Sequence, residues 1–427
     1  MTERGTTSGK MSWGNIKKYF NRFNHRLVAA SDSHDDYKNV ADYVCDGTAD
    51  DEQIQDAIDE IEAVSGDHGG VIGLAPGKFN VAAQVNVRGH GMHIAGLGGR
   101  RNRNSAAASQ LGGGTVLLAA PGLAGAILDF RLAGDTAQLN GCSIRNLTID
   151  GNANIGTAVD GLFWNVWRGV ISEVDIYEMS GNGLHVREFA NGIGDNRIFS
   201  CQFGYSTLAG ILFDTFGADN HIVGVICNNN QDGVRIKAAS EQFVSLHTFD
   251  NSRYGIWFDG AGSRTKITNW KCENSGQHGL FIDGSSGSAP VDVQVSGANF
   301  KGNSASADNT YAHIAVLGGG VGNIFRGTFT NLAFGSIGTV NPAYCIQLDA
   351  RAEDMTFDNF SIQSTAWETA DILDSGKRNV FNGWSKNAGN PASAGNWNGV
   401  NGRQGIMVRD TTNSLNYVWI NGAWVGI

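Results

Sequence analysis

Asp259 and Asp283 are the residues of this chain most suited to acid–base chemistry, because each ends one of two consecutive copies of a short repeated phrase. Two carboxylates held close together tend to keep one proton between them, which raises one pKa and supplies an acid and a base together. Asp214 ends an earlier copy and is the third candidate for catalysis. A separation of about 5 Å would resemble a retaining glycosidase, whereas Asp214 and Asp259, two copies apart, would approach the inverting distance.

The phrase occurs eight times between Gly161 and Ala350: a small or turn residue, an aliphatic residue, an outward residue, a second apolar residue and often Asp. Its first six copies begin at residues 161, 183, 210, 233, 255 and 279, in steps of 22, 27, 23, 22 and 24 residues. A period in this range is typical of a stacked solenoid, and apolar residues at every second position indicate strands.

Alternate residues of a strand face opposite sides, so the phrase predicts what faces the core. If the first and third residues after the small residue point inward, both inward columns are wholly apolar. These columns are Leu162, Leu184, Ile211, Val234, Ile256 and Leu280, and Trp164, Val186, Phe213, Ile236, Phe258 and Ile282. The outward columns are then Phe163, His185, Leu212, Arg235, Trp257 and Phe281, and Asn165, Arg187, Asp214, Lys237, Asp259 and Asp283.

The second outward column alternates in charge from Arg187 to Asp259, and the alternation fails at Asp283. A surface ion-pair ladder, which contributes little to stability, accounts for the alternating part. The pair Asp259 and Asp283 has no cation beyond it in its own column, which makes it the candidate for catalysis.

Trp257 and Phe281 lie beside this carboxylate pair on the same face. Aromatic faces suit the apolar faces of sugar rings, and a row of exposed aromatics is not expected on an inert surface. The alternative is that a neighbouring subunit covers the aromatics and that the like charges diverge at a turn. Lyase or epimerase chemistry would need a base beside a cation that neutralises a carboxylate, a role open to Lys237 and Arg235. The predicted saccharide-binding residues are Trp257, Phe281, His185, Arg235, Lys237 and Phe163.

A second apolar alternation follows each copy and indicates a second strand in each coil, as in Ile171–Ile176 and Val244–Phe249. The positions that follow these strands hold Asn229, Asn251 and Asn274. We expect these asparagines to form a purely structural ladder along turns that tolerate left-handed backbone.

The sequence before the repeats begins with Asp46-Gly-Thr-Ala-Asp-Asp51 and continues into a helix with an apolar face near residues 51–64. Acceptors such as Asp50 and Asp51 favour a helix start. A calcium loop is the alternative, but no further ligands follow at regular spacing. Gly69-Gly-Val-Ile-Gly-Leu-Ala-Pro-Gly-Lys-Phe79 then leads into alternating valines.

This opening, over about residues 42–87, resembles that of the pectate-lyase-like right-handed parallel β-helix proteins, and the repeats extend the resemblance to about residue 377. In that superfamily the helix caps the first coil, and many members are bacteriophage tailspikes. The resemblance implies an all-β, right-handed parallel β-helix. It does not imply one chemistry, because the superfamily includes lyases, hydrolases, epimerases and inert spikes.

Two terminal parts flank the β-helix predicted for residues 34–377. In residues 1–33, the apolar residues Trp13, Ile16, Phe20, Phe23 and Leu27 form one helical stripe. This segment is a docking helix, an oligomerisation helix or a membrane-surface helix. Residues 378–427 are predicted to form a C-terminal β module, with a hairpin at Ile420–Ala423 that is similar to modules closing phage tail proteins.

The composition narrows the partners and the compartment. The net charge of −10 argues against nucleic acid. The six cysteines lack any CxxC pair and are predicted to be reduced core thiols, although an even count permits disulfides. We identify no apolar run of membrane-spanning length and no signal peptide after Lys10, so ordinary secretion is not expected. The sequence predicts neither a metal site nor a cofactor.

These observations predict a virion surface or tailspike-like protein that binds a host cell-surface polysaccharide and cleaves it or only holds it. Residues 1–33 would contact other virion proteins, and the resemblance implies a homotrimer. One alternative is a stand-alone polysaccharide lyase, hydrolase or epimerase. The other is a purely structural spike or capsid decoration protein without enzymatic activity.

Overall fold

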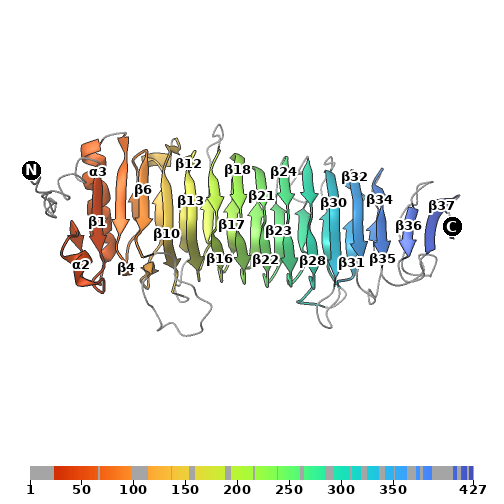
Figure 1. Cartoon of the computed structure of the whole chain (residues 1–427), viewed down its shortest axis with the longest axis horizontal. Coiled ribbons are helices and arrows are strands. Elements are labelled where there is room, and N and C mark those ends of the chain that lie inside the picture. The colour runs from red at the N-terminus through yellow and green to blue at the C-terminus, as the bar shows by residue number, and fades with distance from the viewer. Residues whose placement is uncertain are drawn as a thin grey trace, which may run out of the picture.

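The chain folds as a right-handed parallel β-helix whose coils are stacked along the long axis of the molecule (Figure 1). The computed structural model describes residues 24–65, 68–98, 114–135, 137–152, 159–187, 194–214, 217–237, 239–259, 264–283, 292–307, 310–318, 325–335, 342–350, 352–362, 372–375, 378–386, 407–410, 415–420 and 423–426.

One wall of the β-helix is a parallel sheet, here called sheet I. It is formed by the strand of the repeated phrase in each coil and by the equivalent strands before and after the repeats. Each strand pairs with the equivalent strand of the next coil. Its strands are β5 (Val85–Val87), β8 (Gly125–Phe130), β11 (Val159–Trp164), β14 (Leu184–Val186), β17 (Ala209–Phe213), β20 (Asp232–Ile236), β23 (Tyr254–Asp259), β26 (Leu280–Asp283), β29 (Ala312–Leu317), β31 (Tyr344–Leu348) and β33 (Ile372–Asp374).

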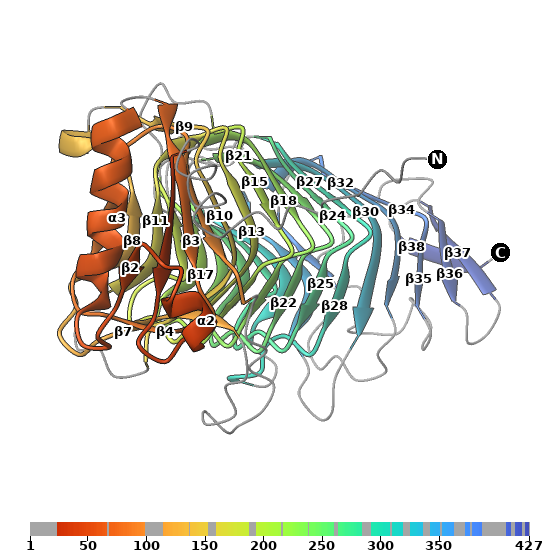
Figure 2. The same cartoon turned by 60° about the vertical axis from the view of Figure 1, so that its left-hand side comes forward.

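The other two walls form one bent sheet, here called sheet II, whose two arms meet at a corner (Figure 2). In the first arm lie β15 (Arg197–Phe199), β18 (Gly217–Val223), β21 (Ala239–Val244), β24 (Thr265–Thr268) and β27 (Val293–Ser296). In the second lie β16 (Gln202–Gly204), β19 (Ile226–Asn228), β22 (His247–Phe249), β25 (Lys271–Glu273) and β28 (Asn299–Lys301). Strands that run through the corner are β10 (Ser143–Asp150), β13 (Val170–Tyr177), β30 (Phe325–Gly335) and β32 (Ala352–Ile362), and β34 (Val380–Asn382) and β35 (Trp384–Lys386) pair with β32.

A single left-handed residue in each coil makes the corner between the two arms. Ser200, Ser245 and Asn269 have φ of 54°, 56° and 54° at this position, and Gly224 has 62°. One residue with positive φ bends the chain into the next strand without a longer loop. The two arms therefore stay short, and the outward residues of each arm keep the same register from coil to coil.

The predicted inward columns are confirmed. In sheet I, Leu162 pairs with Leu184, Leu184 with Ile211 and Ile211 with Val234. Side chains of both columns are buried, and the largest of them include Trp164, Phe213 and Phe258. Fully burying a side chain of this size contributes about 1.5–3 kcal/mol relative to leaving it exposed.

The small residue that opens the phrase is required by the contact between coils. A Cβ on Gly183, Gly233 or Gly255 would lie 2.6, 2.5 or 2.5 Å from the carbonyl oxygen of the corresponding glycine in the next coil. Protein atoms do not approach a Cβ this closely, so these three positions require glycine. The later copies, which begin with His313 and Cys345, pair in register without it.

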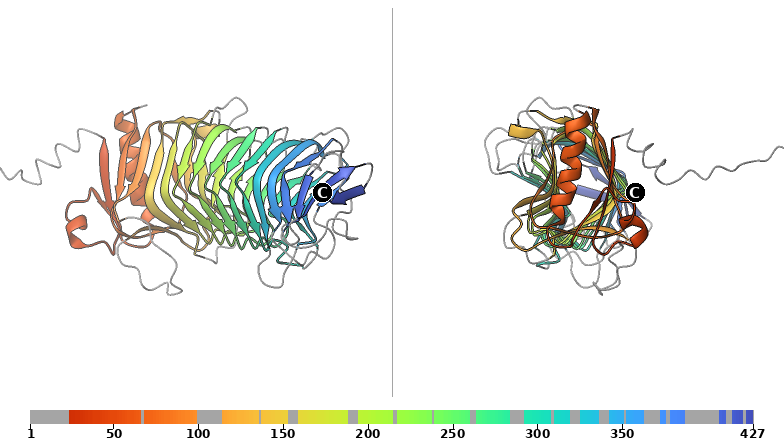
Figure 3. Two further views of the ribbon diagram at one scale, coloured as in Figure 1. Left: turned by 45° about the vertical axis from the view of Figure 1, so that its right-hand side comes forward. Right: turned by 90° about the vertical axis from the view of Figure 1, so that its left-hand side faces the viewer.

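The predicted cap helix is α3 (Asp50–Ser65), which lies across the N-terminal end of the coils (Figure 3, right) and buries Ile54, Ala57, Ile58 and Ile61. Asp50 accepts hydrogen bonds from the backbone N–H of Gly47 and of Asn80, both at 2.7 Å. Asp51 accepts from Ala82 N–H at 2.7 Å. These carboxylates hold the first coil instead of forming a calcium loop.

The first coils contain β1 (His25–Ala29), β2 (Tyr43–Val44), β3 (Gly70–Leu74), β4 (Gly77–Val81), β6 (Met92–Gly96) and β7 (Thr115–Ala119), with the short helix α2 (Asp35–Lys38). A 3₁₀ turn, η3 (Ala133–Asp135), also occurs in this part of the chain. Two short strands, β9 (Leu139–Asn140) and β12 (Val166–Trp167), pair with each other in a small sheet separate from sheets I and II.

The ends of the β-helix differ from the predicted boundaries. Leu27, expected as the last residue of a helical stripe, lies in β1, which pairs in parallel with β3, so coils begin at His25 and not after residue 33. The other stripe residues, Trp13, Ile16, Phe20 and Phe23, lie outside the described residues. Strand alternation in β1 overlaps the helical spacing, and pairing with β3 decides between them.

At the C-terminal end, parallel pairing continues through β34 and β35, beyond residue 377. The predicted hairpin follows: β36 (Met407–Asp410), β37 (Leu415–Ile420) and β38 (Ala423–Gly426) pair antiparallel. Ile420 pairs with Ala423 and Trp419 with Trp424, as the sequence predicted.

The asparagine ladder is two columns instead of one. Asn229, Asp250 and Asn274 share the left-handed position, with φ of 56°, 53° and 52°. Asn251 lies in the next, buried column, where its Oδ1 accepts from the Asn230 backbone N–H at 3.0 Å. Cys227 pairs with Thr248 and Thr248 with Cys272, so these coils differ in length, and a sequence alignment on asparagine therefore mixes the two columns.

All six cysteines are buried free thiols, which agrees with the prediction of reduced core residues. Burial raises the pKa of Cys45 and of Cys142 to about 12, so both stay protonated at neutral pH. Among the described residues, no helix combines the length and the apolar character needed to cross a membrane.

Replacing Gly255 by alanine should destabilise the coils. Its methyl group would lie 2.5 Å from the Gly279 carbonyl oxygen and 2.6 Å from Cys272 Sγ. Overpacking of this kind costs about 1–3 kcal/mol. Gly73→Ala is the matched control in β3, because the nearest atoms would be 3.5 Å away. Urea unfolding followed by tryptophan fluorescence compares the two variants, and an unchanged midpoint for Gly255→Ala would contradict the close-contact requirement.

Candidate functional site

The nine predicted site residues all lie on the outward face of sheet I, where each is partly buried. Phe163, His185 and Leu212 are register partners in consecutive coils, and so are Arg235, Trp257 and Phe281. Asp259 pairs directly with Asp283, as predicted. The outward face is therefore a continuous surface in which residues far apart in the sequence become neighbours along the axis.

Four polar residues form a hydrogen-bonded chain across four consecutive coils. His185 Nδ1 lies 2.7 Å from Asp160 Oδ2, and His185 Nε2 lies 3.4 Å from Asp214 Oδ2. Lys237 Nζ donates to the other oxygen of Asp214 at 2.7 Å. The short distance at Nδ1 makes Asp160 the stronger partner of the imidazole.

The two aspartates change the protonation of His185. Burial alone would lower its pKa, but the hydrogen bonds and charges of Asp160 and Asp214 outweigh burial and raise it. In return, hydrogen bonds from His185 and Lys237 hold the pKa of Asp214 well below its usual range. Asp214 is therefore ionised at neutral pH and can stabilise a positive charge, whereas its lowered pKa makes it a weak base and excludes it as a proton donor.

Two arginines cover the ring of Trp257. The guanidinium carbons of Arg235 and Arg253 lie 4.1 and 4.4 Å from its centroid, within the range of cation–π contacts. The indole Nε1 of Trp257 is buried and has no hydrogen-bond partner in the described structure. The sequence predicted an exposed Trp257. The ring is instead half-buried, because arginines from its own coil and from the preceding one pack against it.

Each of these arginines is also held by a carboxylate. Arg235 Nε donates to Asp259 Oδ2 at 2.9 Å. Arg253 Nε donates to Asp232 Oδ1 at 2.8 Å. The cations proposed from the sequence to neutralise a substrate carboxylate, Arg235 and Lys237, are thus paired with carboxylates of the chain itself.

The pairing of Arg235 with Asp259 also changes the setting of the carboxylate pair. The sequence showed no cation in the column of Asp259 and Asp283, but Arg235 reaches Asp259 diagonally from the neighbouring column and the preceding coil. The two aspartates are therefore not an isolated pair of like charges, because the guanidinium of Arg235 lies against Asp259.

An aromatic group extends the face beyond Trp257. Tyr254 and Phe281 lie 4.8 Å apart between ring centroids, and His278 stacks on Phe281 at 5.2 Å. His278 Nδ1 accepts a hydrogen bond from the Ala312 backbone N–H at 3.0 Å, and burial lowers its pKa to about 4. His278 is therefore neutral and acts as another flat ring in this group.

The opposite end of the face is formed by Phe163. Its ring contacts His185 at 4.9 Å and the guanidinium of Arg131 at 5.0 Å. Arg131 and Arg88 both bind the buried carboxylate of Asp129, at 2.7 and 3.0 Å. Rings and ion pairs thus alternate along the face from Phe163 to Phe281.

Sequence reasoning missed Asp160, Asp232, Tyr254 and His278, which all immediately precede the small residue of the phrase. Strict alternation would place them inward. A Cβ on this glycine would point toward the interior. The glycine and the residue after it therefore both face inward, and the residue before it faces outward. The run Asp160, Asn182, Ala209, Asp232, Tyr254 and His278 was a usable signal once this break at glycine is recognised.

Among the described residues, no group of three His, Cys, Asp or Glu side chains is arranged to hold a metal ion.

The fold and this face define a right-handed β-helix protein with a rigid, outward-facing row of rings and paired charges. Residues 157–362 match the family model described as "Right handed beta helix region". A sequence search against curated proteins finds no significant match.

Solved structures with the same fold include carbohydrate-acting proteins and a viral protein. The A-module of mannuronan C-5 epimerase AlgE6 from Azotobacter vinelandii is 18% identical with a TM-score of 0.53, covering 81% of this chain and 97% of that one. DFA-IIIase from Arthrobacter chlorophenolicus A6 is 15% identical with a TM-score of 0.59, covering 85% and 95%. ORF18 of Geobacillus virus E2 is 14% identical with a TM-score of 0.58, covering 100% and 77%. These likenesses show the fold.

Replacing His185 by glutamine should remove a pH-dependent stabilisation. Because the folded pKa is raised, the protonated ring stabilises the fold fully below its ordinary pKa of 6.5, and this contribution is lost as pH rises through the folded pKa. Hydrogen bonds to charged groups contribute about 1.5–3 kcal/mol. The unfolding free energy of the wild type should therefore exceed that of His185→Gln most at about pH 5–6.

His247→Gln is the control on sheet II, because burial lowers the pKa of His247 despite its contact with Glu273. Protonation of His247 opposes folding, so the difference between wild type and this variant should grow with rising pH. Urea titrations at several pH values measure both differences. A His185→Gln difference that does not change with pH would show that Asp160 and Asp214 do not hold a protonated ring.

Proposed function

We propose that the outward face of sheet I, from Phe163 to Phe281, binds an extended polysaccharide, and that the protein is a tailspike-like component of a virion surface. The observation that carries the proposal is the group of partly exposed rings of Tyr254, Trp257 and Phe281, which lies beside paired charges on one rigid wall. Half-covered rings of this kind keep one edge or face for a sugar while their positions are fixed by packing.

The geometry of sheet I suits a polymer that runs along the axis. Successive strands of a parallel sheet lie about 4.8 Å apart, so the five steps from Phe163 to Phe281 span roughly 24 Å. Over this length a glycan would meet the polar chain around His185 at one end and the rings near Phe281 at the other. Fixed polar groups such as Asp160 and Lys237 offer hydrogen bonds to hydroxyl groups without being reordered.

Similar structures support a carbohydrate ligand and a viral setting. The epimerase is named for its action on mannuronan, a polysaccharide, and the viral ORF18 protein aligns over the whole of this chain. Residues 1–23 precede the first strand and are the segment that would attach the protein to other virion proteins. The deletion that tests this role is residues 1–23, because removing residues 1–33 would also remove β1. Removing residues 1–23 should abolish incorporation into particles and leave glycan binding intact.

Cleavage or epimerisation of the glycan is the second candidate function, and the chain Asp160–His185–Asp214 favours it. An ionised Asp214 next to a histidine with a raised pKa places a charge-stabilising carboxylate and a proton donor 3.4 Å apart. Asp259 and Asp283 would then act on the same glycan two and three coils further along the axis. A purely structural spike is the remaining alternative, and it requires that no glycan binds.

Replacing both Tyr254 and Phe281 by alanine should weaken glycan binding by about tenfold or more, because truncating aromatic residues that anchor a ligand costs more than about 1 kcal/mol each. A glycan array with the full-length chain identifies the ligand, and titration of the best glycan measures the loss. Phe249→Ala is the matched control, since this half-buried ring lies on sheet II and contacts the ring of His247, with 4.6 Å between the centroids.

Product analysis on the same glycan separates binding from catalysis. Released reducing ends, unsaturated sugars or epimerised sugar units that disappear in Asp214→Asn, Asp259→Asn or Asp283→Asn would establish an enzyme, whereas a glycan that is neither cleaved nor epimerised would establish a binding protein. Equal affinity of the wild type and the Tyr254, Phe281 double variant would contradict the proposed face. A chain that binds no glycan on the array would favour the structural spike.

A further inference from the structure

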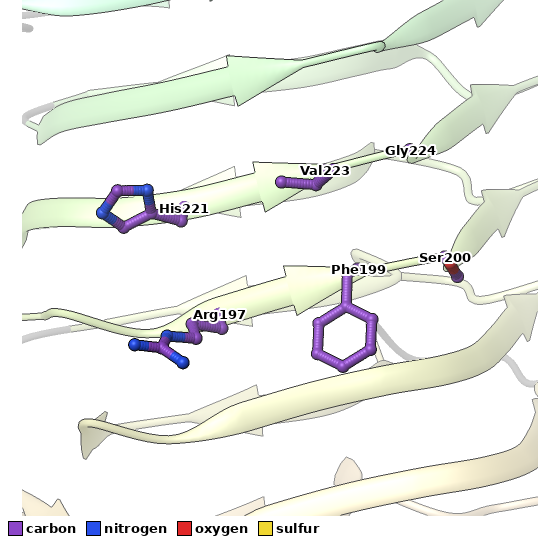
Figure 4. Close-up of a pocket in the computed structure, with 6 residues that line it drawn as sticks. All are labelled: Arg197, Phe199, Ser200, His221, Val223 and Gly224. Carbon is purple, nitrogen blue, oxygen red and sulfur yellow. The ribbon is translucent and has the colours of Figure 1, made fainter.

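A second surface with a different character lies on the first arm of sheet II. Figure 4 shows an open hollow between β15 and β18 lined by six residues: Arg197, Phe199, Ser200, His221, Val223 and Gly224. Arg197 pairs in register with His221, and Phe199 with Val223. The hollow thus has a polar side and an apolar side, each formed by adjacent coils.

The polar side continues along the axis. His221 pairs in register with Gln242, and Gln242 with Lys266, so Arg197 and Lys266 are three coil steps apart. With strands about 4.8 Å apart, this column is roughly 14 Å long. Arg197, His221 and Lys266 are all exposed.

The cations of this column differ from those of sheet I in their partners. Arg235, Arg253 and Lys237 on sheet I are each bound to an aspartate. Within the part of the chain that the structure describes, neither Arg197 nor Lys266 forms an ion pair with a carboxylate. In a chain with a net charge of −10, such cations are available to an anionic ligand.

The apolar side runs parallel to the cations. Phe199, Val223 and Val244 follow one another in register and have exposed fractions of 39%, 43% and 39%. The next positions of this column are the hydroxyl residues Thr268 and Ser296. A ring and two aliphatic side chains beside unpaired cations form a surface with an apolar half and a cationic half.

We propose that this surface, from Arg197 to Lys266, is a second saccharide site that binds a short acidic oligosaccharide through its carboxylates. Arg197 and Lys266 would bind carboxylates of separate sugar units, with the arginine able to donate two parallel hydrogen bonds. The apolar face of a sugar ring would lie on Phe199 and Val223, and His221 and Gln242 would bond to hydroxyl groups. This inference does not depend on glycan binding at sheet I.

The size and charge of the surface favour this ligand over a macromolecule. Three exposed apolar side chains over about 10 Å provide far less than the roughly 800 Å² that each partner of a stable protein interface buries. A nucleic acid would need a larger basic footprint than two cations on an acidic chain. A carboxylated oligosaccharide matches both the length of the surface and its side-by-side apolar and cationic halves.

The test is titration of the full-length chain with trigalacturonic acid, a carboxylated trisaccharide, and with its fully methyl-esterified form. The acid should bind, and the ester, which has the same rings but no charge, should bind at least tenfold more weakly. Arg197→Gln combined with Lys266→Gln should weaken binding of the acid at least tenfold, and Phe199→Ala should weaken it several-fold. Lys271→Gln, on the second arm and paired with Glu273 in the wild type, should leave it unchanged.

Three results would overturn the proposal: no binding of the acid, equal binding of acid and ester, or an Arg197, Lys266 double variant that binds as the wild type does. Arg197→Lys provides a variant that keeps the charge, and it should bind more tightly than Arg197→Gln. A solution oligomer in which Phe199 is protected from solvent would also overturn it, because a second copy would then occupy the surface. Circular dichroism spectra confirm that each variant retains the β-helix.

Discussion

The contact between the opening glycine of one coil and the carbonyl group of the next is the constraint on which the rest of the molecule depends. A Cβ on Gly233 would lie 2.5 Å from the Gly255 carbonyl oxygen, and a Cβ on Gly255 would lie 2.5 Å from that of Gly279. Glycine at this position lets the strands of sheet I from β11 to β26 pair in register. It also directs two successive residues inward, which places Asp232 and Tyr254 on the outward face.

This strict register produces surfaces of different chemistry on different walls. On sheet I, charged residues from neighbouring coils bind one another, so Arg235 is held by Asp259 and Lys237 by Asp214. These networks fix the rings and the imidazole of His185 in place, as a preorganised binding surface requires. On the first arm of sheet II, Arg197 and Lys266 form no ion pair with a carboxylate of the described residues and are exposed to solvent.

The solenoid, the cap helix, the inward columns and the pairing of Asp259 with Asp283 could be predicted from the sequence, because all depend on periodic apolar positions and local helix signals. The ion pairs of sheet I could not be predicted from the sequence. Arg235 reaches Asp259 from a different outward column, and a comparison of residues within one column misses such contacts. Asp160 and Tyr254 were missed because alternation breaks at glycine. The start of the β-helix at His25 was missed because β1 has apolar spacing compatible with a helix.

A structure of the full-length chain with its bound oligosaccharide tests the central claim most directly. The account predicts an extended glycan on the outward face of sheet I, with sugar rings against Tyr254 and Phe281 and hydroxyl groups near His185 and Lys237. A glycan bound away from this face, with Tyr254, Trp257 and Phe281 left in contact with solvent alone, would contradict it.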